Sequence, residues 1–386
     1  MARGGKIRVG LIFGGRSGEH EISIRSARSV VDAIDRSRFE LTLIGIDVSG
    51  SWHLYSDDGF RLLAQGGAAA AVTEVVPISG SDGRNLVNVS RPESPVPPLD
   101  VVFPILHGPY GEDGTIQGLL ELADLPYVGS GVLGSAIGMD KDVQKRLLRD
   151  SGIPIVPFVA ATASRWAAEP EEIEQCALAL GLPLFVKPAN LGSSIGISKV
   201  TAAGRLRGAI EGAFAYDTKV IIERGIDARE IECSVLGNDD PRASVPGEIE
   251  PGAEFYNYEA KYDADSHARL IIPAPLTPVL VARVRDLAVR TFQTIECAGM
   301  ARVDFLLDRR TSDLYVNELN TIPGFTSISM YAKLWEASGV PYRELITRLI
   351  DLALERHEAR ARIGSARRRE TRARRERLTT DDPDEY

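Results

Sequence analysis

The first 140 residues alternate short apolar runs with segments of helical spacing, and this alternation limits the fold more than any other feature. Ile7–Phe13 and Leu41–Asp47 are the first two strand-like runs, and a helical pattern lies between them. Strands that alternate with helices form a parallel sheet with crossover helices. We therefore predict a doubly wound α/β domain over residues 1–128, in which residues 49–98, rich in glycine, alanine and proline, form an irregular insertion.

A different pattern follows residue 138, where short strands and helices occur without regular alternation. The longest helical segment is Pro278–Ala298, and strands that look antiparallel flank it. This pattern favours two α+β domains, a central one over residues 129–223 and a C-terminal one over residues 224–356. The predicted fold class is thus α/β, with an N-terminal doubly wound parallel-sheet domain followed by two α+β domains.

The last residues, 357–386, differ in composition from the rest. From Arg356 to Tyr386 there are ten arginines and seven acidic residues, a net charge of +3, whereas the preceding 355 residues carry −12. An acidic body argues against nucleic acid as a partner, because phosphate contacts require an excess of lysine and arginine. We predict a charged, disordered tail or a solvated helix of interleaved Arg and Glu, with a nucleic-acid-binding arm over Arg367–Arg377 as the alternative.

The cysteines and the lengths of the apolar runs bear on location. Cys176, Cys233 and Cys297 form neither a CxxC pair nor an even framework, which suits a reducing compartment. The run Val9–Phe13 is too short for a secretory signal, and no stretch reaches 18 apolar residues. We expect a cytoplasmic protein without a membrane partner.

Two strand-like segments in the C-terminal domain carry polar side chains that share a face. Positions i and i+2 of a strand point the same way, so Arg302 lies with Asp304, and Glu318 with Asn320. If the turn between the segments centres near Thr311, the two carboxylates face each other. Facing carboxylates are destabilising unless a cation lies between them, and two carboxylates with an amide oxygen suit Mg²⁺. An edge hairpin with its charged face in water is the alternative.

A loop of small residues follows Lys187, which ends an apolar strand. The loop, Gly192–Gly196, lacks the GK[ST] order of a Walker A motif before a helix. Backbone N–H groups of such a hairpin can still lie over phosphates while a lysine neutralises their charge. The signal is weak by itself, since Gly/Ser loops are usually turns.

Eight segments resemble, in order along the chain, the D-alanine–D-alanine ligases of the ATP-grasp superfamily. They are GGRSGEHEIS (14–23), HGPYGEDG (107–114), MDK (139–141), VKPANLGSSIGISKV (186–200), IIERGIDAREIE (221–232), FYNYEAKY (255–262), ARVDF (301–305) and NELNTIPGFTSISM (317–330). The resemblance implies an ATP-grasp fold whose two α+β domains clamp ATP. It also implies ligation of two D-alanines through an acyl phosphate, for peptidoglycan precursor synthesis, by a homodimer.

The resemblance implies which groups hold ATP and its metal ions. Lys141 and Lys187 would neutralise phosphates, Glu223 would reach the adenine edge and Glu230 the ribose hydroxyls. The implied ATP-binding residues are Lys141, Lys187, Ser194, Glu223, Ile226, Glu230 and Lys261. The implied ligands of two Mg²⁺ or Mn²⁺ ions are Asp304, Glu318 and Asn320.

The resemblance also implies the groups that act on D-alanine. Glu19 would bind the ammonium group of the first D-alanine, with Ser193 and Tyr262 linking it to a loop that acts as a lid. Arg302 and the N–H of Gly324 would form an oxyanion hole. The implied substrate-binding residues are His107, Ser329 and Met330.

Several of these residues have a structural alternative. Glu223 and Glu230 could be ordinary surface glutamates, His107 a buried histidine with satisfied hydrogen bonds, Lys141 a solvated residue in the first turn of its helix, and Asn320 a turn residue. The order of the eight segments favours the functional interpretation for all of them, least strongly for His107.

Three other activities remain as alternatives. A depsipeptide ligase would join D-alanine to D-lactate, and another ATP-grasp enzyme would join a different carboxylate and amine. The segments FYNYEAKY and GEHE favour the dipeptide ligase over both. A nucleotide-binding regulator that has lost catalysis is the third alternative, and an intact Arg302 argues against it.

Overall fold

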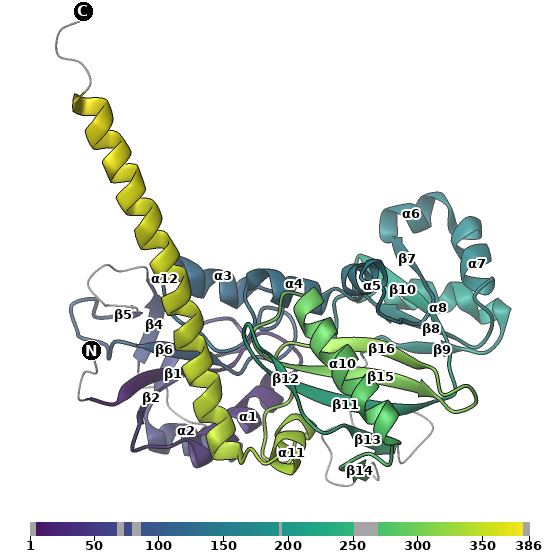
Figure 1. Ribbon diagram of the computed structural model, residues 1–386, viewed down its shortest axis with the longest axis horizontal. Coiled ribbons are helices and arrows are strands. Elements are labelled where there is room, and N and C mark those ends of the chain that lie inside the picture. The colour runs from purple at the N-terminus through teal and green to yellow at the C-terminus, as the bar shows by residue number, and fades with distance from the viewer. Residues whose placement is uncertain (1–4, 68–72, 79–85, 193–194, 251–268, 381–386) are drawn as a thin grey trace, which may run out of the picture.

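The computed structural model describes residues 5–67, 73–78, 86–192, 195–250 and 269–380. Its described strands form three sheets, of six, four and six strands. The sheets come from successive stretches of the chain, which Figure 1 colours purple to blue, teal, and green.

The N-terminal sheet is mixed. Its strands, in spatial order, are β5 (Leu86–Asn88), β4 (Thr73–Pro77), β3 (Trp52–Tyr55), β2 (Phe39–Ile46), β1 (Ile7–Gly14) and β6 (Val101–Pro104). β1 pairs in parallel with β2 and β6, as predicted, whereas β3, β4 and β5 are antiparallel to their neighbours. The prediction of an irregular insertion at 49–98 is wrong for these strands, which extend the sheet, and the parallel part is limited to three strands.

Helices cover both faces of the parallel strands. They are α1 (His20–Ala33) and α3 (Thr115–Leu122), while α2 (Asp57–Leu63) lies within the 49–98 segment. Leu11 of β1 belongs to the same buried cluster as Val30 of α1. The next residue, Ile12, points to the other face and clusters with Leu120 of α3. The parallel strands are thus wound on both sides, as the alternation of strands and helices predicted.

The central sheet is antiparallel and has its own core. Its strands, in spatial order, are β7 (Phe158–Thr162), β10 (Lys219–Arg224), β8 (Leu184–Pro188) and β9 (Ser198–Val200). Its helices are α6 (Ala163–Ala168), α7 (Pro170–Leu178), the 3-10 turn η1 (Ala203–Arg205) and α8 (Leu206–Ala213). Ile173 and Ile210 of the helices pack against Val186 and Val220 of the strands in one buried cluster.

Two helices connect the N-terminal and central parts, α4 (Val132–Met139) and α5 (Lys141–Asp150). The side chain of Asp140 caps α5, because it accepts hydrogen bonds from the backbone N–H groups of Asp142 and Val143 at 3.1 and 3.0 Å. This cap fixes Lys141 as the first residue of its helix.

The C-terminal sheet carries the predicted hairpin. Its strands, in spatial order, are β14 (Arg269–Ile271), β13 (Gly247–Glu250), β11 (Ala228–Gly237), β15 (Gly299–Asp308) and β16 (Leu314–Asn320), with β12 (Arg242–Ala243) beside β11. Helix α10 (Pro278–Thr294) begins where the sequence predicted, with Thr277 as its cap and proline in its first turn. Phe292 of α10 shares a buried cluster with Val303 and Phe305 of β15.

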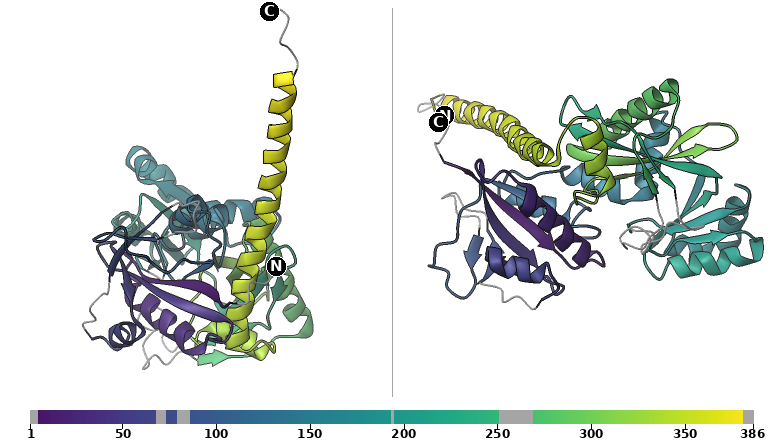
Figure 2. Two further views of the ribbon diagram at one scale, coloured as in Figure 1. Left: turned by 90° about the vertical axis from the view of Figure 1, so that its left-hand side faces the viewer. Right: turned by 90° about the horizontal axis from the view of Figure 1, so that it is seen from below.

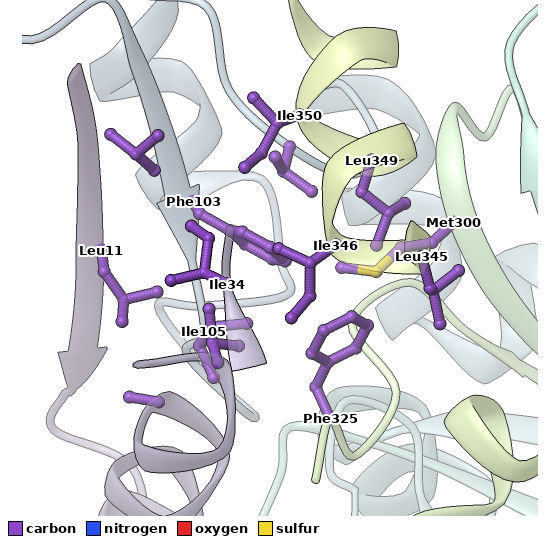
Figure 3. Packing of buried hydrophobic residues seen from close by; sticks show 14 of the residues in the cluster. Leu11, Ile34, Phe103, Ile105, Met300, Phe325, Leu345, Ile346, Leu349 and Ile350 are labelled. Atoms are coloured by element: carbon purple, nitrogen blue, oxygen red, sulfur yellow. The ribbon is translucent and has the colours of Figure 1, made fainter. Parts of the chain in front are cut away.

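The last two helices are α11 (Met330–Ala337) and α12 (Tyr342–Thr380). The first turns of α12 join the N-terminal and C-terminal parts in a single core, shown in Figure 3. Leu345 and Ile346 of α12 are fully buried beside Phe103 of β6, and Met300 of β15 and Phe325 belong to the same cluster. The two parts therefore share apolar surface at α12, in addition to the separate buried cluster that each has elsewhere.

The second half of α12 extends away from the body, as Figures 1 and 2 show. Disorder of the tail is thus a wrong prediction as far as Thr380, and the predicted helix of interleaved Arg and Glu describes this segment. A charged segment can remain helical because arginine and glutamate have high helix propensity. Within the described ranges, no helix has an apolar stretch that could cross a membrane.

Arg356 attaches α12 to the boundary of the N-terminal part. Its guanidinium donates hydrogen bonds to the carbonyl oxygens of Gly129 and Tyr127, the second at 3.0 Å, and lies 4.6 Å from the centre of the Tyr127 ring. The Tyr127 hydroxyl donates to Glu121 at 2.7 Å, and Glu121 also pairs with Arg360.

We expect Arg356→Ala to lower the free energy of unfolding by about 1–2 kcal/mol, because two backbone acceptors lose a charged donor. Urea titration at neutral pH would measure the loss. Arg362→Ala is the control, since Arg362 is exposed and pairs with the exposed Glu358 of the same helix at 3.5 Å. Equal stability of Arg356→Ala and wild type would contradict the importance of this attachment.

Candidate active site

The β15–β16 hairpin has the predicted register. Arg302 lies opposite Asn320, and Asp304 lies opposite Glu318. A β-bulge, which the sequence did not predict, falls between Asp304 and Phe305, directly after the pair of carboxylates. The two acidic side chains and the amide therefore share a face, and the prediction is confirmed.

β11 adds a third carboxylate that the sequence analysis missed. Glu232 lies opposite Asp304, so the acidic positions on β11, β15 and β16 form a row across the sheet. Adjacent like charges are destabilising unless cations compensate them. The Arg302 Nε atom lies 2.7 Å from Asp304 Oδ1 and 2.9 Å from Glu232 Oε2, and Lys141 Nζ lies 3.6 Å from Glu318 Oε2. Each carboxylate in the row thus has a cation beside it.

The donor set on the hairpin fits a divalent cation. The Asn320 Nδ2 atom donates to Asp304 Oδ2 at 3.0 Å, so the amide lies against the carboxylate. Two carboxylates and an amide supply the hard oxygen ligands that Mg²⁺ prefers. In the described part of the chain, no three His, Cys, Asp or Glu side chains gather as a metal cage. An ion here would complete its shell with phosphate oxygens or water, as Mg²⁺ commonly does.

One carboxylate and two lysines form a cluster of charged side chains with little exposure, two of them on strands of the central sheet. Glu223, at the end of β10, is only 3% exposed, so it is not the surface glutamate that was the alternative. Its two oxygens lie 2.7 Å from Lys145 Nζ and 2.5 Å from Lys187 Nζ. Burial alone would raise the pKa of Glu223, but the charges of the two lysines outweigh burial and lower the pKa to about 2.

The pKa values of the two lysines in this cluster are shifted in opposite directions. Burial lowers the pKa of Lys145, and the attraction of Glu223 offsets only part of the effect. Burial also acts on Lys187, but attraction to Glu223 and Glu318 outweighs it and raises the pKa. The sequence analysis identified Lys187 as a site residue but missed Lys145. The sequence signal that could have indicated Lys145 was its position four residues after Lys141.

Lys141 is buried, so the solvated-lysine alternative is wrong. Its side chain donates a 2.6 Å hydrogen bond to the carbonyl oxygen of Leu191, at the start of the small-residue loop. A Cβ atom built on Gly192 would lie 3.4 Å from Glu19 Oε2, so this loop reaches the N-terminal part. The predicted site residues Ser193, Ser194, Lys261 and Tyr262 lie outside the described residues.

His107 is buried, and both of its ring nitrogens have partners. Nδ1 lies 3.1 Å from the carbonyl oxygen of Ile322, and Nε2 lies 3.2 Å from the Ser26 hydroxyl. A carbonyl can only accept, so Nδ1 carries the proton and Nε2 accepts from Ser26. Burial lowers the pKa of His107, although the charge of Glu19 opposes the shift. The ring is a satisfied buried histidine that also lines the cavity described below.

Glu112 is a second residue that the sequence analysis missed. Its carboxyl oxygens accept hydrogen bonds from the backbone N–H of Gly108 at 2.6 Å and of Ile322 at 3.2 Å. Glu112 and His107 thereby hold both sides of the Ile322 backbone, two residues before Gly324. Burial and the charge of Glu19 raise the pKa of Glu112 to about 8.

One cavity, of about 140 Å³, is lined by most of the residues that the resemblance implies for binding or activating D-alanine. Side chains or backbone from all three parts of the chain line it: Glu19, His107, Glu112, Gly192, Glu232, Arg302, Glu318, Asn320, Gly324, Ser329 and Met330. Residues that are more than 300 positions apart in the sequence thus meet at one place. The ring of carboxylates, one guanidinium and backbone N–H groups suits a small zwitterion.

The remaining predicted residues lie along the strands that lead to the cavity. Ile226 is in the loop between β10 and β11, and Glu230 is on β11, two residues before Glu232 on the same face. Both are partly buried. The structure therefore pairs Lys187 with Glu223 and Lys141 with Glu318, and it places Glu230 two residues from the acidic row.

Lysines beside a small-residue loop can neutralise phosphates, and an acidic row can hold the cations that accompany them, so the fold and the site fit the class of ATP-dependent ligases. The family model described as the N-terminus of D-Ala-D-Ala ligase matches residues 8–130, and the model of the C-terminus matches residues 147–351. The chain belongs to the D-alanine–D-alanine ligase family.

Curated relatives agree with this assignment. The chain is 51% identical over 359 residues to D-alanine–D-alanine ligase A of Escherichia coli K12, covering 92% of this chain and 97% of that one. It is also 51% identical over 365 residues to D-alanine–D-alanine ligase of Shouchella clausii, covering 94% and 98%.

Solved structures share the fold. The D-alanine-D-alanine ligase of Coxiella burnetii superposes with a TM-score of 0.83 at 37% identity, covering 96% of this chain and 99% of that one. The VanG D-Ala:D-Ser ligase of Enterococcus faecalis superposes with a TM-score of 0.80 at 34% identity, covering 90% and 100%.

The raised pKa of Glu112 predicts how stability varies with pH. The folded protein retains a proton on Glu112 up to about pH 8, whereas the unfolded chain releases it near the ordinary value of 4.5. This group therefore favours folding at low pH, and its contribution is lost as the pH rises from 5 to 8. Glu112→Gln, which stays neutral, should gain stability relative to wild type over this range by at least about 1 kcal/mol.

Urea titrations of both proteins at pH 5, 6.5 and 8 would measure the difference. Glu74→Gln on β4, away from the cavity, should show no such trend. A constant difference between Glu112→Gln and wild type across the range would mean that Glu112 is ionised at pH 5.

Proposed function

We propose that the protein joins two D-alanines to form D-alanyl-D-alanine, with ATP as the energy source, for peptidoglycan precursor synthesis. The observation that carries the proposal is the single cavity in which Glu19, Arg302, Gly324 and Ser329 meet. Membership of the family supports the same activity. We also propose a cytoplasmic homodimer with domains at residues 1–128, 129–223 and 224–356.

ATP lies between the central and C-terminal sheets in this proposal. Lys141 and Lys187 neutralise phosphate charge, Glu223 and the backbone of Ile226 hold the adenine, and Glu230 holds the ribose. The burial of Lys141 and the low exposure of the Lys187 side chain, 13%, support this, because solvent screens their charge poorly. Ser194 and Lys261 complete the proposed ATP site.

Asp304, Glu318 and Asn320 would hold two Mg²⁺ or Mn²⁺ ions, which would neutralise charge on the transferring phosphoryl group. The chain's own part is to position the carboxylate of the first D-alanine, whose ammonium group binds Glu19. An oxygen of that carboxylate then takes the γ-phosphoryl group of ATP, and ADP leaves.

The second step forms the amide bond. The amine of the second D-alanine, whose carboxylate binds at Ser329 and Met330, attacks the carbonyl carbon of the acyl phosphate. Arg302 and the N–H of Gly324 stabilise the tetrahedral oxyanion, a contact that is typically worth ~3–4 kcal/mol. Inorganic phosphate leaves and takes up the proton that the amine nitrogen gives up. Ser193 and Tyr262 link Glu19 to a loop that excludes water.

A product assay tests the activity. Incubation of the protein with ATP, Mg²⁺ and D-alanine should release one phosphate for each D-alanyl-D-alanine, detected by mass. L-Alanine should give no dipeptide, and D-lactate offered together with D-alanine at neutral pH should give little depsipeptide. Phosphate release without dipeptide, or a preference for D-lactate, would contradict the proposal.

Glu318→Gln should reduce ligation at least about 100-fold, because the hairpin loses one of two carboxylates that bind a cation. The fold should persist, since Gln keeps the shape of Glu. Titration of Mg²⁺ against activity and melting temperature would separate the two effects. Glu250→Gln, at the half-exposed end of β13, is the control. Activity of wild-type level at low Mg²⁺ in Glu318→Gln would exclude this residue from the metal site.

A further inference from the structure

We propose that Glu232 is a positioning residue that fixes the guanidinium of Arg302 at the cavity. The sequence analysis gave Glu232 no role, and the steps described above do not use it. The inference rests on the proposed function, in which Arg302 stabilises an oxyanion, and it names the group that holds Arg302 in place.

Glu232 and Arg302 approach each other diagonally across two strands. Arg302 lies opposite Ser234 on β11, and Glu232 lies opposite Asp304 on β15. The side chain of Arg302 therefore reaches toward the next pair of positions. There its Nε atom lies 2.9 Å from Glu232 Oε2, and both side chains line the same cavity.

Two carboxylates lie against the guanidinium. Arg302 Nε lies 2.7 Å from Asp304 Oδ1, and Nη2 lies 2.9 Å from Asp304 Oδ2. This two-point contact uses the single Nε–H and sets the plane of the guanidinium. Glu232 Oε2, on the neighbouring strand, adds a second negative charge beside Nε, and its attraction acts from a different direction without a hydrogen bond.

The ion pair is shielded from solvent. The side chain of Glu232 is 9% exposed and that of Arg302 is 16% exposed. Buried pairs are screened little by salt, so the charge of Glu232 acts on Arg302 more strongly than the charge of a surface glutamate would.

Glu232 and Asp304 differ in what else they do. Asp304 belongs to the donor set that fits a divalent cation, so its oxygens have a second partner when the metal is bound. Glu232 does not belong to that set. Its contact with Arg302 is therefore the one that does not compete with metal binding, and Arg302 keeps its position as ATP and metal ions enter.

Glu232→Gln and Glu232→Ala in the full-length chain test this inference, with ATP, Mg²⁺ and D-alanine as reactants. We expect dipeptide formation to fall about 10-fold in the Gln variant and about 100-fold in the Ala variant, with KM for ATP changed less than about twofold. Phosphate released per dipeptide should exceed one. A slower attack by the amine allows water to attack the acyl phosphate carbonyl instead, which regenerates D-alanine and releases phosphate.

Glu248→Gln is a matched control. Glu248 is also a buried glutamate of this sheet, paired with Arg229 at 2.7 and 2.6 Å, but it lies opposite Ile231 and does not line the cavity. Glu248→Gln should keep the phosphate-to-dipeptide ratio at one. Urea titration of each variant in metal-free buffer would measure stability separately from activity.

The outcomes distinguish the two proposals. A phosphate-to-dipeptide ratio of one in Glu232→Gln, with a rate equal to that of Glu248→Gln, would overturn the positioning role while the proposed function stands. Wild-type protein that forms no dipeptide would overturn both. If Glu232→Ala does not fold, the Gln variant, which keeps the shape of the side chain, decides the question.

Discussion

The site depends on compensation of like charges across three neighbouring strands. β11, β15 and β16 place Glu232, Asp304 and Glu318 side by side, and this row is stable only with cations against it. Arg302 and Lys141 provide two of them, and each comes from a segment implied in catalysis or phosphate binding. A ligand in the cavity would therefore contact the same carboxylates and cations that compensate one another in the folded sheet.

The sequence predicted how neighbouring elements pair, but it did not predict contacts between residues that are far apart along the chain. The register of Asp304 against Glu318 followed from the two-residue period of strands and the position of the turn. The parallel core around β1 followed from alternating strands and helices. By contrast, no local pattern links Glu112 to Ile322 or Lys145 to Glu223, because these partners are far apart in the sequence.

Two misjudged segments have a common physical reason. β3, β4 and β5 are short, form one side of the sheet and bury few side chains, so their strand pattern was hidden among glycines and prolines. The end of α12 lacks an apolar stripe, and amphipathic periodicity therefore could not indicate a helix. Its composition, rich in arginine and glutamate, contained the information that periodicity lacked.

The shared core around α12 has a mechanical consequence. Leu345 and Ile346 lie in one cluster with Phe103 of the first sheet and Met300 of the third, so the N-terminal and C-terminal parts form one block. The central sheet has a separate core that contains Val186 and Ile210. In the proposed ATP site, Lys187 and Glu223 would therefore move as a pair if the central sheet moved, because they are on adjacent strands of one sheet with its own core.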